Sequence, residues 1–225
     1  VIDNSIDEFI MGNGKRIDIQ LKDNKVAVRD YGRGIPLGKV VECVSVINTG
    51  AKYNDDVFQF SVGLNGVGTK AVNALSSWFR VVSVRDGKCS EAVFERGVLK
   101  TQRTGKVKPD VKNGTLVEFI PDEELFHDYQ FSLEFLQKRI WNYAYLNTGL
   151  TLVFNGDKYI SQNGLLDLLE AEMGTSSLYP MGYYKGKQLE FAFTHSNNYG
   201  ENYFSFVNGQ YTSDGGTHLS AFKEG

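Results

Sequence analysis

The sequence predicts an α+β fold, a two-layer sandwich in which helices cover a mixed, mainly antiparallel sheet, followed by the start of a second α/β unit. Two observations carry this prediction. Segments with apolar residues at helical spacing are interspersed with segments in which apolar and polar residues alternate. Short turn-forming pairs join several of the alternating segments, as in antiparallel hairpins. We place the boundary near residue 180, which gives a first domain over 1–180 and a truncated second domain over 181–225.

The composition excludes several classes of protein. Of 225 residues, 41% are hydrophobic, which argues against general disorder. The net charge of -3 lacks the basic excess of a nucleic-acid groove, so we expect any DNA contact to lie elsewhere. Cys43 and Cys89 stand far apart without His partners, which argues against a zinc site and favours a reducing cytoplasm. No apolar run approaches a membrane span, and Val1 in place of an initiator Met indicates a chain that begins inside a longer polypeptide.

The first third of the chain predicts two helices, a hairpin and a loop. Apolar residues at helical spacing predict helices over 1–11 and 37–48. Between them, alternating runs over 16–21 and 25–30 flank a turn-forming Asp-Asn pair and predict an antiparallel hairpin. The stretch from 49 to 68 has glycines and no sustained period, which predicts a long functional loop.

Strands dominate the rest of the chain. Further helices are expected over 69–75, 131–146 and 164–170 and from 217 to the end. Further strands are expected over 79–85, 89–95, 115–120, 150–155, 188–195 and 203–211, of which the first two are joined by an Asp-Gly turn.

Two clusters in the first helix and hairpin carry candidate chemistry. Asn4 and Glu8 lie one helical turn apart, where an amide oxygen can ligate Mg²⁺ and a carboxylate can orient a partner. Taken alone, the pair is better explained as a solvated polar face of a half-buried helix. The hairpin ends on Asp30, whose carboxylate can accept a hydrogen bond from an amine, and the chain then turns through the run 31–36. Arg33 in this run can lie against a flat ring or pair with Glu8, although an ordinary turn remains the alternative.

A glycine-rich run precedes the helix at Thr69. The glycines of 63–68 allow backbone N–H groups to face inward, and the helix N-terminus adds partial positive charge, so a polyphosphate is a suitable ligand. The spacing matches neither the Rossmann loop nor the P-loop. Lys52 can reach the same phosphates or be a solvated loop lysine, and Thr115 places a hydroxyl at the start of a later strand.

The order of these clusters resembles a known family, the ATPase group of gyrase, Hsp90, histidine kinases and MutL. Within the group, the runs 1–8, 31–36, 63–68 and 72–76 are similar to the B subunits of bacterial type II DNA topoisomerases, of the topoisomerase IV or the gyrase type. Topoisomerase IV is favoured over gyrase, but residues 1–225 do not settle the choice. The run 206–218 resembles the start of the transducer domain that follows the ATPase domain in that family.

The resemblance implies a Bergerat-type ATPase fold that binds ATP and Mg²⁺. Asn4 would ligate the metal, Asp30 would accept the adenine amine, and Thr115 would support it through water. Glu8 and Arg33 would pair beneath the adenine. The ATP-binding residues that the resemblance implies are Asn4, Glu8, Asp30, Arg33, Gly34, Ile35, Pro36, Lys52, Gly63, Leu64, Asn65, Gly66, Val67, Gly68, Arg85 and Thr115.

No catalytic residue is expected within the chain, because the family's general-base glutamate would stand immediately before Val1. Asn65 and Phe58 also depart from the histidine and tyrosine usual in the family. The expected function is that of an ATP-dependent topoisomerase, in whose B subunits Mg-ATP closes a dimeric gate for DNA; this fragment alone would hydrolyse ATP poorly. Expected partners are ATP, the topoisomerase A subunit, a second copy of the ATPase region and, through the full-length enzyme, DNA, with no membrane. The alternatives are a nucleotide-responsive module without turnover, or a mismatch-repair or chaperone member of the same ATPase group.

Overall fold

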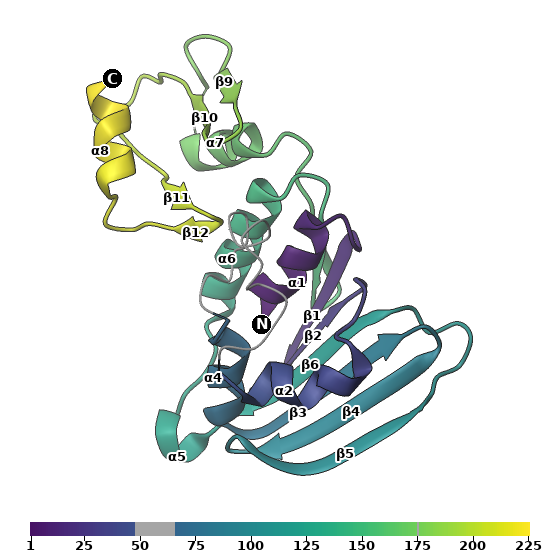
Figure 1. Cartoon of the computed structure of the whole chain (residues 1–225). Helices are drawn as coiled ribbons and strands as arrows, with labels where there is room; N and C mark the ends of the chain where they lie inside the picture. Colours follow the sequence, from purple (N-terminus) through teal and green to yellow (C-terminus); the bar gives the residue numbers. More distant parts are fainter. Residues whose placement is uncertain (48–65, 175) are drawn as a thin grey trace.

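The computed structural model describes residues 1–47, 66–174 and 176–225 (Figure 1). Its central feature is an eight-stranded sheet of order β5-β4-β3-β6-β2-β1-β7-β8. The strands of this sheet are β1 (Arg16–Lys22), β2 (Lys25–Asp30), β3 (Ser76–Arg85), β4 (Lys88–Glu95), β5 (Val98–Lys106), β6 (Gly114–Pro121), β7 (Thr151–Phe154) and β8 (Asp157–Tyr159). Of the strand pairs in the described ranges, only β1 and β7 are parallel, so the expected mixed, mainly antiparallel sheet is confirmed.

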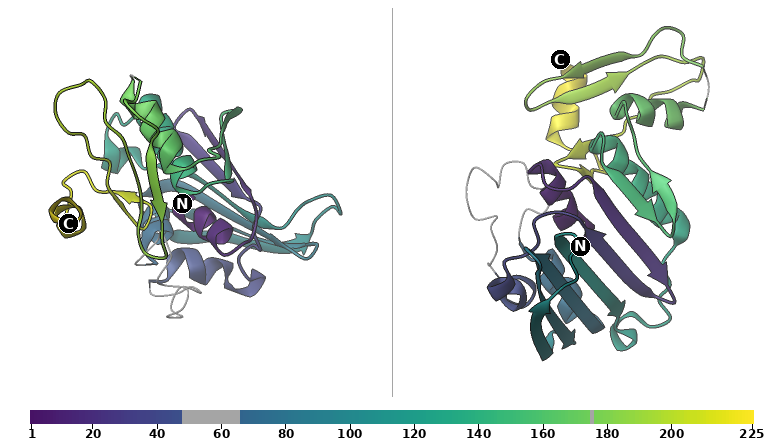
Figure 2. Two further views of the ribbon diagram at one scale, coloured as in Figure 1. Left: turned by 90° about the horizontal axis from the view of Figure 1, so that it is seen from above. Right: turned by 90° about the vertical axis from the view of Figure 1, so that its right-hand side faces the viewer.

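Helices cover one face of this sheet (Figures 1 and 2). They are α1 (Ile2–Ile10), the short η1 (Leu37–Lys39) and α2 (Val40–Ser45), α4 (Gly68–Ala74) and α6 (Leu133–Leu146), while α5 (Glu123–Phe126) and α7 (Leu165–Met173) lie at the margins. Ile6 of α1 and Ile140 of α6 are almost fully buried against β1, β2 and β7. A second buried cluster joins Val40 and Val44 of α2 to Phe79 of β3 and to β4. The first cluster thus places α1 and α6 over β1, β2 and β7, and the second places α2 over the neighbouring strands β3 and β4.

The β1–β2 hairpin has the register that the sequence predicts. Its turn, Asp23 and Asn24, takes positive φ values of 47° and 60°, and Lys22 pairs with Lys25. Two-residue turns with positive φ at both positions match the right-handed twist of paired strands. The alternation then turns Val26, Val28 and Asp30 inward, so that the strand ends on a buried carboxylate.

The chain after α7 forms smaller elements at one end of the molecule (Figure 1). They are the hairpin of β9 (Gly182–Lys185) and β10 (Glu190–Phe193), the hairpin of β11 (Phe206–Val207) and β12 (Gln210–Tyr211), and α8 (Thr217–Glu224). The single strand expected over 203–211 was therefore wrong. Asn208 and Gly209 both have positive φ and fold this run into a two-residue hairpin.

Four elements were not predicted: β5, β8, β9 and α5. Every residue of β5 is exposed, so this edge strand lacks the apolar alternation by which a strand is found. The helix expected over 37–48 is shorter and split between η1 and α2. Most of the loop expected over 49–68 lies outside the described residues.

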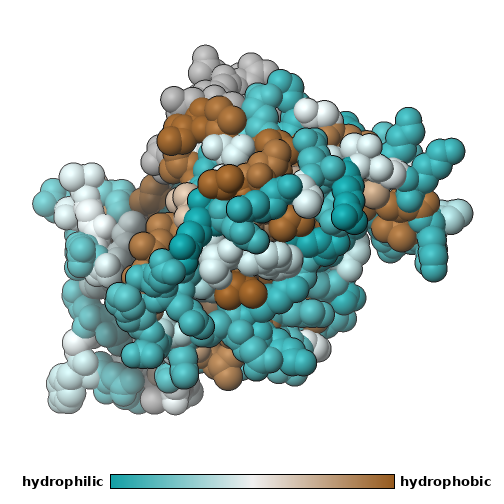
Figure 3. Space-filling model, turned by 90° about the horizontal axis from the view of Figure 1, so that it is seen from below, coloured by the Kyte–Doolittle hydropathy of each residue, from teal (hydrophilic) through white to brown (hydrophobic). Residues whose placement is uncertain are grey.

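The surface is mixed in polarity. Seen from below (Figure 3), hydrophobic side chains occur in several separate groups among hydrophilic ones. Among the helices of the described residues, none is long and apolar enough to span a membrane.

Candidate functional site

Asp30 is the buried acid at the end of β2, with 6% of its surface exposed. The backbone N–H groups of Gly32 and Thr115 donate to its Oδ1 at 2.9 and 3.1 Å. Within the described residues both hydrogen bonds go to Oδ1, which leaves Oδ2 able to accept from a ligand. Burial raises the pKa of Asp30, although these two hydrogen bonds and the charge of Arg29 act in the opposite direction. A donor brought to Oδ2 would therefore interact with a poorly solvated carboxyl group, where hydrogen bonds are strong.

The turn after Asp30 needs glycine at two positions. A Cβ on Gly32 would lie 2.7 Å from Oε2 of Glu8, and a Cβ on Gly34 would lie 2.6 Å from the carbonyl oxygen of Val84. Gly34 also has a φ of +77°, which side-chain-bearing residues rarely adopt. The turn is thus pressed against α1 on one side and β3 on the other, which an ordinary exposed turn would not require.

Glu8 and Arg33 form the ion pair that was expected. Arg33 Nη2 donates to Glu8 Oε1 at 2.8 Å, Nε donates to Oε2 at 3.1 Å, and the Arg33 backbone N–H donates to Oε2 at 3.0 Å. Burial acts to raise the pKa of Glu8, but the hydrogen bonds and charge of Arg33, with the charge of Arg85, hold it below its ordinary value. The pair fixes the guanidinium plane across the turn, and about half of the Arg33 side chain stays exposed for a planar ligand.

Asn4 lies on the exposed side of α1, one turn before Glu8. Its Nδ2 donates to Oγ1 of the buried Thr69 in α4, which holds the amide and joins the two helices. Groups of three or more His, Cys, Asp or Glu that could enclose a metal are absent from the described residues. A single amide oxygen still fits Mg²⁺ that arrives on a polyphosphate, because Mg²⁺ keeps several waters and takes few protein ligands.

Gly66, Val67 and Gly68 are the described part of the glycine-rich run. The buried Lys70 of α4 donates from Nζ to the carbonyl oxygen of Gly66, whose φ is +58°. This contact fixes the run where it enters α4. Lys52, Gly63, Leu64 and Asn65, which were also predicted to contact a ligand, lie outside the described residues.

Of the remaining predicted residues, Ile35 and Pro36 end the turn and Arg85 lies on β3 beside it. Ile35 is held by its carbonyl oxygen, which accepts a 2.7 Å hydrogen bond from Ser83 Oγ of β3. Pro36 follows it and is exposed. Arg85 lies two residues beyond Ser83 on the same face of β3 and is close enough to lower the pKa of Glu8.

Three residues join the site that the sequence analysis missed or described differently. Thr115 contributes its backbone N–H to Asp30, whereas the sequence suggested its hydroxyl. Ser83 and Thr69 anchor the turn and Asn4. Ser83 could have been found from the sequence, because it stands at an inward position of an alternating strand, two residues before Arg85.

Comparisons with known proteins show similarity to B subunits of bacterial type II topoisomerases. Residues 157–225 match the family model described as DNA gyrase B. The chain is 61% identical to the B subunit of DNA topoisomerase 4 from Borreliella burgdorferi, an alignment that covers 100% of this chain and 37% of that protein. It is 34% identical to the B subunit of DNA gyrase from Helicobacter pylori, over 100% of this chain and 32% of the relative. The chain thus spans about a third of the length of these relatives.

A solved structure shares the fold. The crystal structure of the 43K ATPase domain of Thermus thermophilus gyrase B, in complex with an aminocoumarin, superposes with a TM-score of 0.75 and 32% identity. The match covers 99% of this chain and 63% of that one. The predicted fold class, helices on a mainly antiparallel sheet as in the gyrase B ATPase domain, is confirmed.

Proposed function

From its homologues, which are B subunits of bacterial type II topoisomerases, we propose that this chain is the ATP-binding region of such a protein. The observation that carries the proposal is the buried Asp30 carboxylate. Two backbone N–H groups hold its Oδ1, and Oδ2 is left for a ligand donor. The amine of adenine is a donor of the required kind, whereas guanine presents a carbonyl oxygen at the equivalent place. Two acceptors would then face each other, which disfavours GTP.

The other residues take their places around this anchor. Arg33, fixed by Glu8, lies against the base, with Ile35 and Pro36 as its apolar wall and Arg85 at the mouth of the pocket. Thr115 supports Asp30. The backbone of 63–68 and the side chain of Lys52 contact the phosphates in this proposal. Support comes from the placement of Gly66–Gly68 directly before α4, whose Thr69 contacts Asn4.

Asn4 would hold Mg²⁺ through its side-chain amide oxygen. When bound, the metal would neutralise charge on the phosphates. This chain's own contribution is to fix α1: Thr69 holds Asn4, and Arg33 holds Glu8 one turn later on the same helix.

For the whole protein we propose an ATP-dependent type II DNA topoisomerase, an isomerase, in which nucleotide binding closes a dimer that gates DNA passage. Its partners would be the topoisomerase A subunit, a second copy of the ATPase region, and DNA. Residues 1–180 would form the ATP-binding domain and 181–225 the first part of the transducer domain. The start of a separate two-stranded sheet at β9 supports this division. A cytoplasmic location is proposed from the same homologues.

Equilibrium titration tests the proposal. ATP with Mg²⁺ should bind this chain with one site and in clear preference to GTP, measured by calorimetry. Titration with EDTA present separates the base contact from the metal contribution, because ATP should bind more weakly but keep its preference over GTP. Equal affinity for ATP and GTP would overturn the assignment of Asp30.

A further inference from the structure

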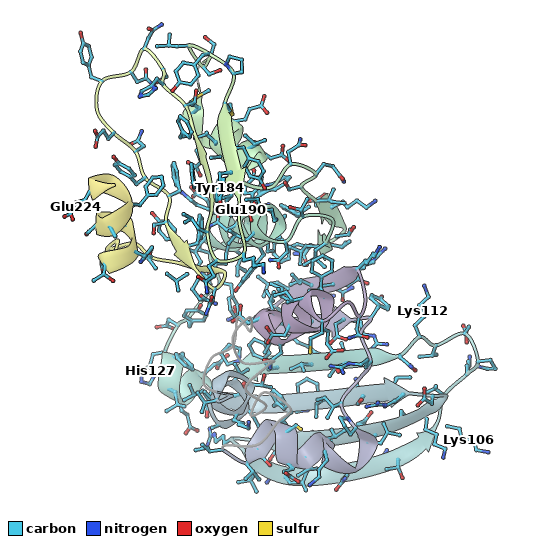
Figure 4. The ribbon with its side chains drawn as sticks, turned by 45° about the horizontal axis from the view of Figure 1, so that its top comes forward. Lys106, Lys112, His127, Tyr184, Glu190 and Glu224 are labelled. Atoms are coloured by element: carbon cyan, nitrogen blue, oxygen red, sulfur yellow. The ribbon has the colours of Figure 1, made fainter. Side chains whose placement is uncertain are left out.

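The net charge of the chain conceals a cationic end of the sheet. Residues 85–112 contain eight Lys or Arg and four Asp or Glu, whereas the whole chain has a net charge of -3. This segment forms the β3–β4 turn, the strand β4, the edge strand β5 and the loop that leads into β6. Figure 4 shows Lys106 and Lys112 at the same end of the sheet. We call the exposed cations of this end the cationic tip: Lys88, Lys106, Lys108 and Lys112.

Three cations stand in one row across three strands. In the strand register, Arg85 of β3 lies directly opposite Lys88 of β4, and Lys88 lies directly opposite Lys106 of β5. Residues directly opposite in paired strands place their side chains on the same face. Like charges at such positions are destabilising. The row also begins at Arg85, at the candidate pocket, and runs outward from it.

Few carboxylates compensate the cationic tip. Lys88, Lys106, Lys108 and Lys112 take part in none of the ion pairs found among the described residues. Glu91, on the neighbouring part of β4, pairs with Arg80, and Glu95 pairs with Lys100. The two glutamates of β4 are therefore used elsewhere, Asp86 pairs with Arg85, and Asp110 forms none of the ion pairs found among the described residues.

Backbone contacts hold the cationic tip in place. Val107 N–H donates to the carbonyl oxygen of Gly87 at 3.0 Å, and Asp86 N–H donates to Asn113 Oδ1 at 2.9 Å. Arg29, from the opposite face of the sheet, donates from Nη2 to the carbonyl oxygen of Lys112 at 2.7 Å. The turn, the end of β5 and the following loop thus form one fixed surface, and the guanidinium of Arg29 adds to its positive charge.

Protection of an exposed edge does not explain this arrangement. Lysines on an edge strand prevent pairing with other chains, but of the four lysines of the cationic tip only Lys106 lies on the edge strand β5. Lys88 lies on β4, which is paired on both sides, and Lys108 and Lys112 lie in a loop outside the ladder. A row of like charges that costs stability indicates an anionic partner.

We infer that the cationic tip binds the phosphate backbone of duplex DNA. The spacing of cations over successive strands suits an extended polyanion better than a single ion, and backbone contacts need no base recognition. The choice of DNA over an acidic protein rests on the proposed function, since the homologues are DNA topoisomerases. The cationic tip would contact DNA beside the nucleotide pocket, although the net charge of the whole chain predicts no DNA contact.

The test uses the whole chain and a fluorescein-labelled 20-base-pair duplex of arbitrary sequence, followed by anisotropy at two salt concentrations. The chain should bind in the range typical of non-specific contacts, with a Kd of about 10⁻⁴ to 10⁻⁶ M. The triple variant Lys88→Gln, Lys106→Gln and Lys108→Gln should bind at least roughly tenfold more weakly. The slope of log K against log salt should fall by about two to three, since each phosphate contact contributes about 0.9.

A matched variant controls for net charge. Lys22→Gln, Lys158→Gln and Lys187→Gln remove three other exposed lysines without ion pairs among the described residues, and this variant should bind DNA nearly as the parent chain does. The melting temperature of the tip variant should be unchanged or higher, because a like-charge row is relieved. Equal losses in both triple variants, or no duplex binding by the parent chain, would overturn the inference.

Two further measurements separate the explanations. Polyglutamate that binds the tip while duplex DNA does not would identify an acidic protein partner and also overturn the inference. ATP titration of both variants should give the parent affinity, since neither contains a residue of the pocket. Failure of the parent chain to bind ATP would contradict the proposed function. The DNA measurement would still test the cationic tip, because it does not depend on ATP binding.

Discussion

The hydroxyl group of Tyr143 in α6 donates a 2.6 Å hydrogen bond to Oδ1 of Asp3 in α1. Gln210 of β12 donates to the same oxygen at 3.4 Å and accepts from Arg139 of α6. Asp3 directly precedes Asn4, so one carboxylate joins the helix of the candidate site to α6 and to the β11–β12 hairpin. The position of Asn4 is therefore coupled to a segment more than 200 residues later.

Removal of the Tyr143 hydroxyl should destabilise the chain. Tyr143→Phe is expected to lower the free energy of unfolding by about 1.5 kcal/mol at pH 8, because the lost hydrogen bond is to a charged group. Urea unfolding measures the change. Burial and the charge of Asp3 raise the pKa of Tyr143 to about 12. Its stabilising contribution is thus complete below the ordinary pKa of 10 and is lost as pH rises toward 12. The difference between parent and variant should narrow over that interval; a constant difference would contradict the hydrogen bond.

Asp30→Asn should weaken the selection of adenine without lowering the stability of the fold. The new side-chain oxygen can keep both backbone hydrogen bonds of Oδ1, and because burial raises the pKa of Asp30, loss of the charge should leave the melting temperature at pH 7 unchanged or higher. The new NH₂ group, however, would face the adenine amine. ATP should bind roughly 10- to 150-fold more weakly, corresponding to about 1.5–3 kcal/mol, and the preference over GTP should narrow. Calorimetry with both nucleotides measures this; an unchanged ATP-to-GTP ratio in the folded variant would contradict the anchor role.

Gly34→Ala should cost more than Gly87→Ala. Both glycines have similar positive φ values, +77° and +74°, so the backbone strain is matched. A Cβ on Gly34 meets the Val84 carbonyl oxygen at 2.6 Å, whereas one on Gly87 meets nothing within 4 Å. We expect about 1–2 kcal/mol of destabilisation for Gly87→Ala from strain and about 1–3 kcal/mol more for Gly34→Ala from overpacking. Thermal and urea unfolding compare the two, and equal losses would show that the turn is not pressed against β3.

The ion pair of Glu8 and Arg33 should matter more for the ligand than for stability. Arg33 is half exposed, so a double-mutant cycle with Glu8→Gln and Arg33→Gln should give a coupling below about 1 kcal/mol, similar to that of the exposed Lys39–Glu42 pair. Because the pKa of Glu8 is lowered, this coupling should be present above pH 4.5 and vanish as pH falls through the lowered value. Arg33→Gln should weaken ATP binding by a larger factor than it weakens folding. Normal ATP affinity in the Arg33→Gln variant would show that Arg33 does not contact the nucleotide.

The sequence predicted those features that depend on local pattern. The hairpins at Asp23–Asn24 and Asp86–Gly87 follow from alternation and turn residues alone. The same turn signal, Asn208–Gly209, was present in the run that was wrongly read as one strand. The β5 strand lacks an alternating pattern because all its residues are exposed, although the two-residue turn Arg96–Gly97 that joins it to β4 contains a glycine that could have indicated a hairpin.

In the candidate site, too, the features with a local sequence pattern were predicted and those that depend on the folded chain were not. Asp30 and its glycines were visible as a strand end and a turn, and the Glu8–Arg33 pair was one of two contacts that the residues allowed for Arg33, also implied by the family resemblance. The Thr115 backbone N–H was not predictable as a donor, because every residue except proline carries one. The link between Asp3, Tyr143 and Gln210 depends on three elements that meet only in the folded chain.

The register of β2 determines the sign of the charge inside the candidate site. Arg29 and Asp30 are neighbours of opposite charge on opposite faces of the sheet, and the two-residue turn at Asp23–Asn24 sets which of them faces inward. A slip of β2 by one position exchanges its two faces. One residue inserted into that turn would therefore replace a buried acceptor by a buried cation, about six residues away from the insertion. The same slip would carry Val26 and Val28 out of the core, so the length of a distant turn holds both the core and the acceptor of the candidate site in place.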